Sequence, residues 1–248
     1  MRYLIHLQYN GTDYHGWQFQ PNAITVQQEV DRILGLLLKQ KIYTLGCGRT
    51  DAGVHAEQFF AHFDTEIPIE DLQGLVKKLA AVDLPGIHFR NIFPVPDEFN
   101  ARFDAISRTY EYRITTERNP FLHKLSLYCY QKLDVDAMQL AANKLLGRKD
   151  FGAFSKSHTQ VDNTFCNITE ATFILSPGMI TFRISANRFL RNMVRAIVGT
   201  LIDVGKGKMS IEQFIEIIES KNRCKAGVSA GASGLFLVKV EYPNFKEA

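Results

Sequence analysis

The sequence predicts an α/β (α+β) protein made of two ferredoxin-like βαββαβ halves with mainly antiparallel sheets. Two kinds of pattern support this prediction: segments in which apolar and polar residues alternate, and longer segments with helical periodicity that follow capping residues. These segments occur in the order strand-helix-strand-strand-helix-strand, and the order repeats once. The 248 residues suffice for two domains, with a border near residue 105. We therefore expect N-terminal and C-terminal α/β domains at 1–105 and 106–248.

In the first half, alternation from Tyr3 to Tyr9 predicts a strand, which Asn10-Gly11 ends with turn chemistry. Thr25-x-x-Gln28 has the form of a capping box and predicts a helix that continues to about Lys39. The other elements expected here are strands at 41–46, 58–64 and 87–93 and a helix near 69–80.

The same order returns in the second half. Strands are expected at 107–115, 167–176, 179–185 and 235–242, and helices at 135–146 and 186–204. A second capping box, Ser210-x-x-Gln213, predicts an additional helix. Residues 149–163 are polar and irregular, which indicates a mobile loop.

Composition excludes several classes of protein. The apolar content of 46% and the net charge of +3 are those of an ordinary globular protein. The four cysteines lie far apart without a C-x-x-C pair, which favours reduced thiols over disulfides or a zinc site. The chain shows neither a secretory segment nor an apolar run near the ~20 residues that span a bilayer. We expect a cytoplasmic protein without a membrane partner.

The stretch from Gly46 to His55 is the main functional candidate. Its glycines let the backbone turn tightly and approach a ligand, and they surround one cation, Arg49, and one carboxylate, Asp51. Such an Asp could be a nucleophile, a general base, a metal ligand or only a turn residue. The neighbouring Arg49, with basic and aromatic residues far along the chain, favours a functional loop.

A second candidate is a group of four arginines within thirteen residues, namely Arg183, Arg188, Arg191 and Arg195. On the expected helix at 186–204, the last three lie away from the apolar stripe. They could form a solvated face, but the planar guanidinium also suits phosphate or carboxylate. Binding phosphates or pairing with Asp51 is therefore the competing interpretation.

Aromatic residues raise a similar choice. Tyr110 and Tyr112 share a face of the strand expected at 107–115, where tyrosines are most often part of a core. The nearby Arg102 and Arg108 instead suggest a rim where a base stacks and phosphates are held. Trp17, the chain's single tryptophan, could be a core residue or a platform for bases.

One motif is a decoy. His55-Ala56-Glu57 matches the H-x-E opening of zinc nucleobase deaminases. That chemistry also requires two thiolate ligands, usually as P-C-x-x-C, and the sequence has no such pair. We therefore reject this interpretation.

Several motifs lie along nearly the whole chain. The most specific is Gly48-Arg49-Thr50-Asp51-Ala52-Gly53-Val54-His55. The others are the runs 9–18, 25–27, 101–103, 108–112, 193–199 and 234–237. In their residues and their order, these motifs resemble those of the tRNA pseudouridine synthase A family. The chain departs from the family pattern at 80–87. Before Leu84-Pro85, where the family usually has Asn, it reads Ala80-Ala81-Val82-Asp83. The family then usually has Asp before the Ile, whereas this chain runs from Gly86 straight to Ile87. We interpret this as a difference in a supporting loop, which concerns that loop's contacts and not the reaction class.

The resemblance implies an isomerase that converts uridine to pseudouridine at positions 38, 39 and 40 of the tRNA anticodon stem-loop. It implies a homodimer whose α/β halves flank a central basic cleft, with neither metal nor organic cofactor. Asp51 would be the nucleophile, Arg195 its partner, and Arg49 a phosphate or loop contact. Tyr110 would stack on the target uracil. The arginines expected to contact substrate are Arg102, Arg108, Arg188 and Arg191.

Two other functions compete with this one. The first is a catalytically silent tRNA-binding or tRNA-folding protein on the same scaffold. A carboxylate facing a polyanion argues against it, since binding alone does not need Asp51. The second is a metabolic α/β enzyme, which would leave the arginine group unexplained.

Overall fold

The computed structural model describes residues 1–156, 163–243 and 245, and it divides into two compact units. Unit 1 comprises Met1–Ile106 with Leu237–Ala248, and unit 2 comprises Ser107–Phe236. The segment from Leu237 onward therefore groups with unit 1, whereas the expected domain 106–248 includes it. The two domains expected from the sequence, 1–105 and 106–248, stay a prediction. Among the described residues, no helix combines the length and apolar character needed to cross a membrane.

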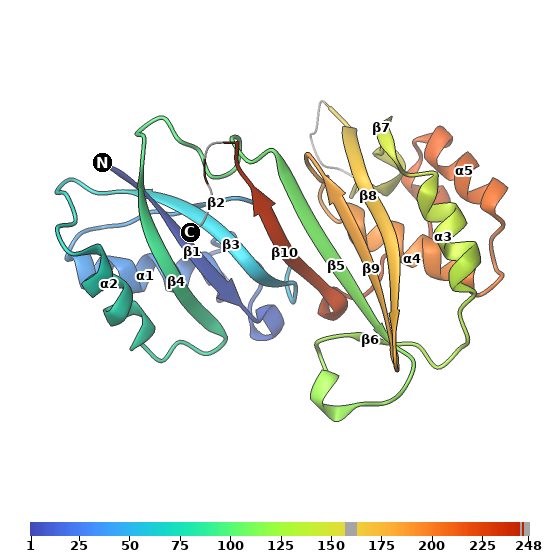
Figure 1. Ribbon diagram of the computed structural model, residues 1–248, viewed down its shortest axis with the longest axis horizontal. Coiled ribbons are helices and arrows are strands. Elements are labelled where there is room, and N and C mark those ends of the chain that lie inside the picture. The colour runs from blue at the N-terminus through green and yellow to red at the C-terminus, as the bar shows by residue number, and fades with distance from the viewer. Residues whose placement is uncertain (157–162, 244, 246–248) are drawn as a thin grey trace. The chain divides into compact units, whose positions relative to one another are not determined.

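Unit 1 has the strand and helix order expected of a ferredoxin-like half. Its main strands hydrogen-bond in the order β4-β1-β3-β10, and β2 also pairs with β3. The pairs β4-β1, β1-β3 and β3-β2 are antiparallel. The elements are β1 (Arg2–Tyr9), α1 (Val26–Leu38), β2 (Leu45–Gly46), β3 (His55–Asp64), α2 (Leu72–Ala80), β4 (Ile87–Val95) and β10 (Leu235–Glu241), with a 3-10 turn η1 (Gly11–Asp13) after β1. Helix α2 contacts β4 and α1 (Figure 1).

The C-terminal segment supplies part of the unit 1 core. Tyr242 meets Phe60 of β3 edge-on, with ring centroids 5.7 Å apart. Phe245 packs against Phe60 and Phe93 at 5.7 and 4.9 Å. Edge-to-face pairs of this kind stabilise beyond their buried area. These rings join the C-terminal segment to β3 and β4 within unit 1.

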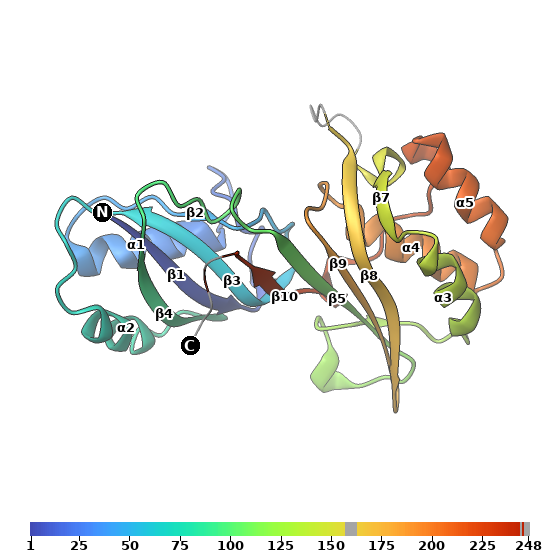
Figure 2. The same cartoon turned by 45° about the horizontal axis from the view of Figure 1, so that its top comes forward.

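Unit 2 is also α+β with antiparallel pairing. Its strands follow the order β5-β9-β8-β7, and β6 pairs with β5 in parallel. Three helices lie together on one side of β8 and β9 (Figures 1 and 2). The elements are β5 (Ser107–Thr115), η2 (Pro120–Leu122), β6 (Leu127–Tyr128), α3 (Val135–Asn143), β7 (Gly147–Asp150), η3 (Gly152–Phe154), β8 (Phe165–Ser176), β9 (Met179–Ala186), α4 (Met193–Gly205), α5 (Ile211–Ser220), η4 (Arg223–Lys225) and η5 (Ala232–Gly234). The mixed α+β class with mainly antiparallel sheets is confirmed.

Both predicted N-caps begin helices, but only the second forms a complete capping box. The Thr25 side chain accepts a hydrogen bond from the Gln28 backbone at the start of α1. At α5 the box is reciprocal, because Ser210 accepts from the Gln213 backbone and the Gln213 side chain accepts from the Ser210 backbone. These local signals need no tertiary partner, which explains why they predict helix starts well.

The expected helix over 186–204 is wrong at its beginning. Strand β9 continues to Ala186, which pairs with Arg108 on one side and Ile168 on the other. Asn192 then adopts a left-handed conformation with φ of 65°, and α4 begins only at Met193. Residues 187–192 therefore form a loop, and strand pairing overrides their helical periodicity.

Two smaller expectations also change. Residues 147–150 form strand β7, so the expected loop at 149–163 begins later. Phe151 and Phe154 within it are fully buried, and 157–162 lie outside the described residues. The strand expected at 41–46 is reduced to Leu45–Gly46.

Helix α1 holds the segment before β2 through side chains. The Thr44 backbone N–H and hydroxyl both donate to Asp31 Oδ1, at 2.9 and 2.6 Å. Gln27 Nε2 donates to the Thr44 carbonyl oxygen at 2.7 Å. Burial raises the pKa of Asp31 to about 6, although both bonds from Thr44 favour the ionised form.

The raised pKa of Asp31 predicts that the stability of the fold decreases as the pH rises from about 4 to 6. Its folded pKa of about 6 lies above the ordinary 3.8, so its contribution to the free energy of unfolding is complete below about pH 4. That contribution is lost as the pH rises through 6. We expect Asp31→Asn, which keeps an uncharged acceptor, to lose less stability than wild type between pH 4 and 7 in urea titrations. The exposed Asp83→Asn is the control and should follow wild type. Parallel curves for wild type and Asp31→Asn would contradict the prediction.

Candidate active site

The loop between β2 and β3, residues 47–54, carries Asp51 and is held from the segment 10–17. Trp17 N–H donates to the Thr50 carbonyl at 3.2 Å, and Gly53 N–H donates to the Tyr14 carbonyl at 3.2 Å. Val54 N–H donates to the Asp51 carbonyl at 3.1 Å, which closes a turn at Asp51. Hydrogen bonds to the segment 10–17 therefore hold the Asp51 loop both before and after Asp51.

Close approach of the two backbones excludes side chains at two glycines. Gly16 has a φ of 87°, and a Cβ there would lie 2.5 Å from the Thr50 carbonyl oxygen. A Cβ on Gly11 would overlap the Val54 carbonyl oxygen. Real Cβ atoms do not approach oxygen so closely, so only glycine fits at these positions. The glycines outside the Asp51 loop thus determine its position as much as those within it.

Trp17 belongs to the core and is not a platform for bases. Its side chain is 2% exposed, and its ring centroid lies 4.2 Å from that of Phe59. A Cβ on Gly46 would lie 2.6 Å from Trp17 Nε1, so the glycine gives the indole its space. Tyr9 adds a buried hydroxyl contact to Thr50 Oγ1 at 2.8 Å. Together these rings support the Asp51 loop from inside unit 1.

The polar groups of the Asp51 loop have distinct environments. Asp51 is partly exposed on its turn, while Arg49 is exposed and its Nη1 lies 3.5 Å from Gln18 Oε1. His55 is buried, and its Nδ1 accepts the Gly11 N–H at 3.1 Å. That bond gives His55 a structural role. Within the described part of the chain, no cluster of three or more His, Cys, Asp or Glu residues is arranged to hold a metal.

Arg102 lies on a turn with its backbone fixed. Asn100 Oδ1 accepts from the N–H groups of Arg102 and Phe103, at 3.0 and 3.1 Å. The neighbouring Ala101 N–H donates to His62 Nδ1 at 3.1 Å, and the Ala101 carbonyl accepts from the Tyr242 hydroxyl at 2.7 Å. The Arg102 guanidinium lies 5.3 Å from the Phe103 ring centroid.

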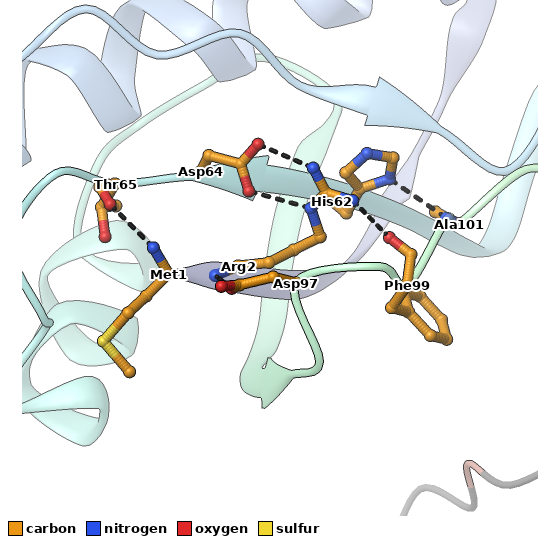
Figure 3. A network of polar contacts seen from close by, with 8 residues as sticks. All are labelled: Met1, Arg2, His62, Asp64, Thr65, Asp97, Phe99 and Ala101. Carbon is orange, nitrogen blue, oxygen red and sulfur yellow. Dashed lines mark hydrogen bonds and ion pairs between the residues drawn. The ribbon is translucent and has the colours of Figure 1, made fainter.

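The same turn is tied to the first strand, as Figure 3 shows. Arg2 donates two bonds of 2.8 Å to the Asp64 carboxylate and one of 2.9 Å to the Phe99 carbonyl. The hydrogen bond from Arg2 holds the pKa of Asp64 below its usual value. Burial lowers the pKa of His62, which keeps its Nδ1 available as an acceptor at neutral pH. This network fixes the route of the chain from β4 to Arg102.

In unit 2, Tyr110 and Tyr112 differ although they share a strand face. Tyr112 is fully buried and its hydroxyl donates to the Gly231 carbonyl at 2.8 Å. Burial raises the pKa of Tyr112, and the Arg195 charge acts in the opposite direction. Tyr110 is only half-buried, and its ring meets Phe189 edge-on at 5.3 Å. Tyr112 is a core residue, whereas Tyr110 lies at the margin of the core with part of its surface accessible.

Arg195, on the first turn of α4, is positioned by the segment 226–231. Arg195 Nε donates to the Ala230 carbonyl at 2.8 Å, and Ala230 N–H donates to the Arg195 carbonyl at 2.9 Å. Asn192 Nδ2 donates to Ser229 Oγ at 2.7 Å. A Cβ on Gly199 would overlap the Val228 carbonyl, so the segment lies directly on the helix. These contacts restrict the guanidinium to few orientations.

The remaining arginines do not form the expected helical face. Arg188 and Arg191 precede α4, in the loop 187–192, and only Arg195 is on the helix. Arg183 pairs with Glu111 and Glu170, at 3.1 and 3.5 Å, which is a structural role. Arg108 Nη1 donates to the Asn187 carbonyl at 3.0 Å at the start of the same loop. Arg188 lies near Cys166, where it opposes the burial that raises the pKa of that thiol to about 11.

The candidate residues therefore fall into two sets. Unit 1 carries Asp51, Arg49 and Arg102, and unit 2 carries Tyr110, Arg108, Arg188, Arg191 and Arg195. Sequence reasoning missed Phe189 and Ala230. The aromatic side chain of Phe189 between arginines is a signal that could have been used. Ala230 gives none, because it acts through its backbone.

The family profile and the related proteins that this chain resembles all carry the same description. The sequence profile of the family described as tRNA pseudouridine synthase matches residues 141–243. The protein named tRNA pseudouridine synthase A of Parabacteroides distasonis is 48% identical over 242 residues, which cover 98% of this chain and 96% of that protein. The protein of the same name from Bacteroides thetaiotaomicron is 46% identical over 245 residues, covering 98% and 91%.

A more distant relative extends the comparison. The protein named tRNA pseudouridine synthase A of Francisella tularensis subsp. novicida is 38% identical over 247 residues, covering 98% of this chain and 95% of that protein. In all three comparisons the aligned part spans at least 98% of this chain. The chain belongs to the tRNA pseudouridine synthase A family.

Proposed function

We propose that the protein is a tRNA pseudouridine synthase that isomerises uridine to pseudouridine at positions 38, 39 and 40 of the anticodon stem-loop. It acts in the cytoplasm as a homodimer. The observation that carries the proposal is the Asp51 turn, a partly exposed carboxylate on a backbone that is bonded on both sides, in a chain of this family. A fixed carboxylate is the group that the reaction needs at the ribose or the base.

The reaction itself is redox-neutral. The bond between N1 and C1′ breaks, a bond between C5 and C1′ forms, N1 gains a proton, and C5 loses one to solvent. Asp51 could add to C1′ of the ribose or to C6 of the ring, or act as a base towards a glycal intermediate. Each route requires an ionised carboxylate, and this balance of atoms and electrons requires neither metal nor organic cofactor.

The other residues have proposed roles that the family resemblance implies. Arg195, whose Nε donates to the Ala230 carbonyl, is the proposed cationic partner of the Asp51 carboxylate. Tyr110, half-buried against Phe189, presents its ring to the flipped uracil. The residues proposed to contact the phosphates of the RNA are Arg49, Arg102, Arg108, Arg188 and Arg191.

The competing function is a catalytically silent tRNA-binding or tRNA-folding protein. Release of tritium from C5-labelled uridine in unmodified tRNA decides between the two, because binding alone leaves the C5–H bond intact. We expect release without any added cofactor, and tRNA binding without release would favour the silent protein.

Asp51→Asn is the direct test of the nucleophile. The change removes the charge but little of the surface that contacts phosphates, so turnover should be lost while tRNA affinity stays within about tenfold. Tritium release measures turnover, and fluorescence anisotropy measures binding. Turnover near that of wild type would remove Asp51 from this role.

Gly16→Ala tests whether the fit of the two backbones positions Asp51. We expect a fall in kcat of about tenfold or more with a smaller change in tRNA affinity, because displacement of a catalytic group by a fraction of an ångström is costly. Gly147→Ala is the matched control. Its φ of 90° imposes similar backbone strain, but a Cβ there meets no atom within 4 Å. Equal losses of kcat in the two variants would assign the effect to strain and not to the clash at Thr50.

Two substitutions of Tyr110 distinguish a stacking role of its ring from a proton-transfer role of its hydroxyl. Tyr110→Ala removes the ring and should weaken placement of the base by roughly 1–3 kcal/mol, whereas Tyr110→Phe retains the ring. If the hydroxyl also removes the C5 proton, Phe would bind tRNA normally but lose about 10²–10⁴-fold in rate. An active Phe variant with an inactive Ala variant would indicate stacking alone. Normal turnover in both would return Tyr110 to the core.

A further inference from the structure

The segment of unit 2 from Glu117 to Lys132, here called the arm, extends from the end of β5 and projects beyond the sheet (Figures 1 and 2). It contains η2 and β6, and no candidate site residue lies within it. None of the roles proposed above uses it.

The arm exposes aromatic rings that a core would normally bury. Phe121 is 87% exposed, Tyr130 is 78% exposed and Tyr128 is 42% exposed. Three large rings exposed on one short segment are unusual, because burial of each ring would remove apolar surface from water. Such a surface indicates a partner with flat apolar groups.

Basic side chains are interspersed with these rings. Arg118, His123, Lys124 and Lys132 are exposed, and the Arg118 guanidinium lies 5.5 Å from the Tyr128 ring centroid. Glu117 is the sole acidic residue of the arm's sequence. A Cβ at Gly178, in the β8–β9 turn, would lie 3.8 Å from the Glu117 carboxylate, so this acid lies beside that turn. The remainder of the arm is positively charged.

The backbone of the arm is ordered by hydrogen bonds within the arm and to β5. Asn119 Oδ1 accepts the Phe121 N–H at 2.9 Å, and Ser126 Oγ donates to the Leu122 carbonyl at 3.1 Å. Strand β6 pairs with β5, and the Cys129 N–H donates to the Thr115 carbonyl at 2.9 Å. The rings of Phe121 and Tyr130 are therefore displayed from a preorganised backbone, which reduces the entropy cost of binding.

We propose that the arm is a second RNA-binding surface, which stacks unpaired bases on Phe121 and Tyr130 and contacts phosphates through Arg118, Lys124 and Lys132. Aromatic rings among cations are the surface that single-stranded RNA requires, because every base has a flat face and every nucleotide a negative charge. The inference rests on the proposed function for the identity of the RNA, a tRNA. It adds contacts that contribute to affinity and not to the chemical step.

A second copy of this chain is the competing occupant of the arm. Two arms facing each other would bring like charges together, since each carries one Arg, two Lys and a single acid over residues 117–132. Charge complementarity therefore favours the polyanion.

The test uses the full chain and an unmodified tRNA transcript. The double variant Phe121→Ala/Tyr130→Ala should bind tRNA about tenfold more weakly and show a raised KM, with kcat at saturating tRNA unchanged. Arg118→Gln should reduce the slope of log K against log salt by about one. Tyr43→Ala is the matched control, because Tyr43 is also exposed and has Lys41 over its ring at 4.9 Å, but lies in unit 1. It should bind as wild type.

The other outcomes distinguish failure of the arm proposal from failure of the proposed function. Unchanged tRNA affinity and salt slope in the arm variants, with normal wild-type turnover, would reject the proposed role of the arm but not the proposed function. An equal loss in Tyr43→Ala would show that the effect is not specific to the arm. A fall in oligomeric state of the arm variants in analytical ultracentrifugation would assign the arm to a second copy. Absence of tritium release from wild type, with weaker tRNA binding by the arm variants, would reject the proposed function but support the arm as an RNA-binding surface.

Discussion

The close approach of two backbone segments in unit 1 determines where Asp51 lies. Residues 10–17 and 50–55 touch so closely that Gly11 and Gly16 have no room for a side chain. The backbone N–H groups of Gly11, Trp17 and Gly53 donate hydrogen bonds between the two segments. Trp17 and Phe59 fill the space behind the loop. A carboxylate on such a support reorganises little when a substrate arrives, which is the main way a protein accelerates reactions at a fixed group. Most of the residues responsible carry no reactive group themselves.

In unit 2, backbone carbonyl groups fix the position of the Arg195 side chain. There, one segment of backbone, 226–231, accepts hydrogen bonds from Arg195 and Tyr112 and packs on Gly199 of α4. The Ala230 carbonyl holds the guanidinium by a neutral acceptor, so the positive charge of Arg195 is not cancelled within this bond. An acidic side chain in the same place would have neutralised that charge. The segment therefore orients Arg195 through backbone atoms.

The sequence predicts those parts of the fold that depend on local signals. Thr25 and Ser210 begin helices because capping is a contact between residues three apart. The arginines at 188, 191 and 195 have helical spacing too, yet the first two lie in a loop. Pairing of Ala186 with Arg108 and the left-handed Asn192 decide this, and both involve contacts or conformations that periodicity does not contain. Trp17 remained ambiguous for the same reason, because its partner Phe59 is far away in sequence.

The distribution of charge limits how the protein can hold a polyanion. A net charge of +3 from 29 basic and 26 acidic residues gives little general attraction to RNA. Several arginines already bind carboxylates within their own unit, among them Arg2 with Asp64, Arg32 with Glu29 and Arg183 with Glu111. Affinity for tRNA must therefore come from local groups of cations and rings whose positions are fixed. Non-specific nucleic acid would satisfy few such groups at once, so selectivity follows from geometry more than from total charge.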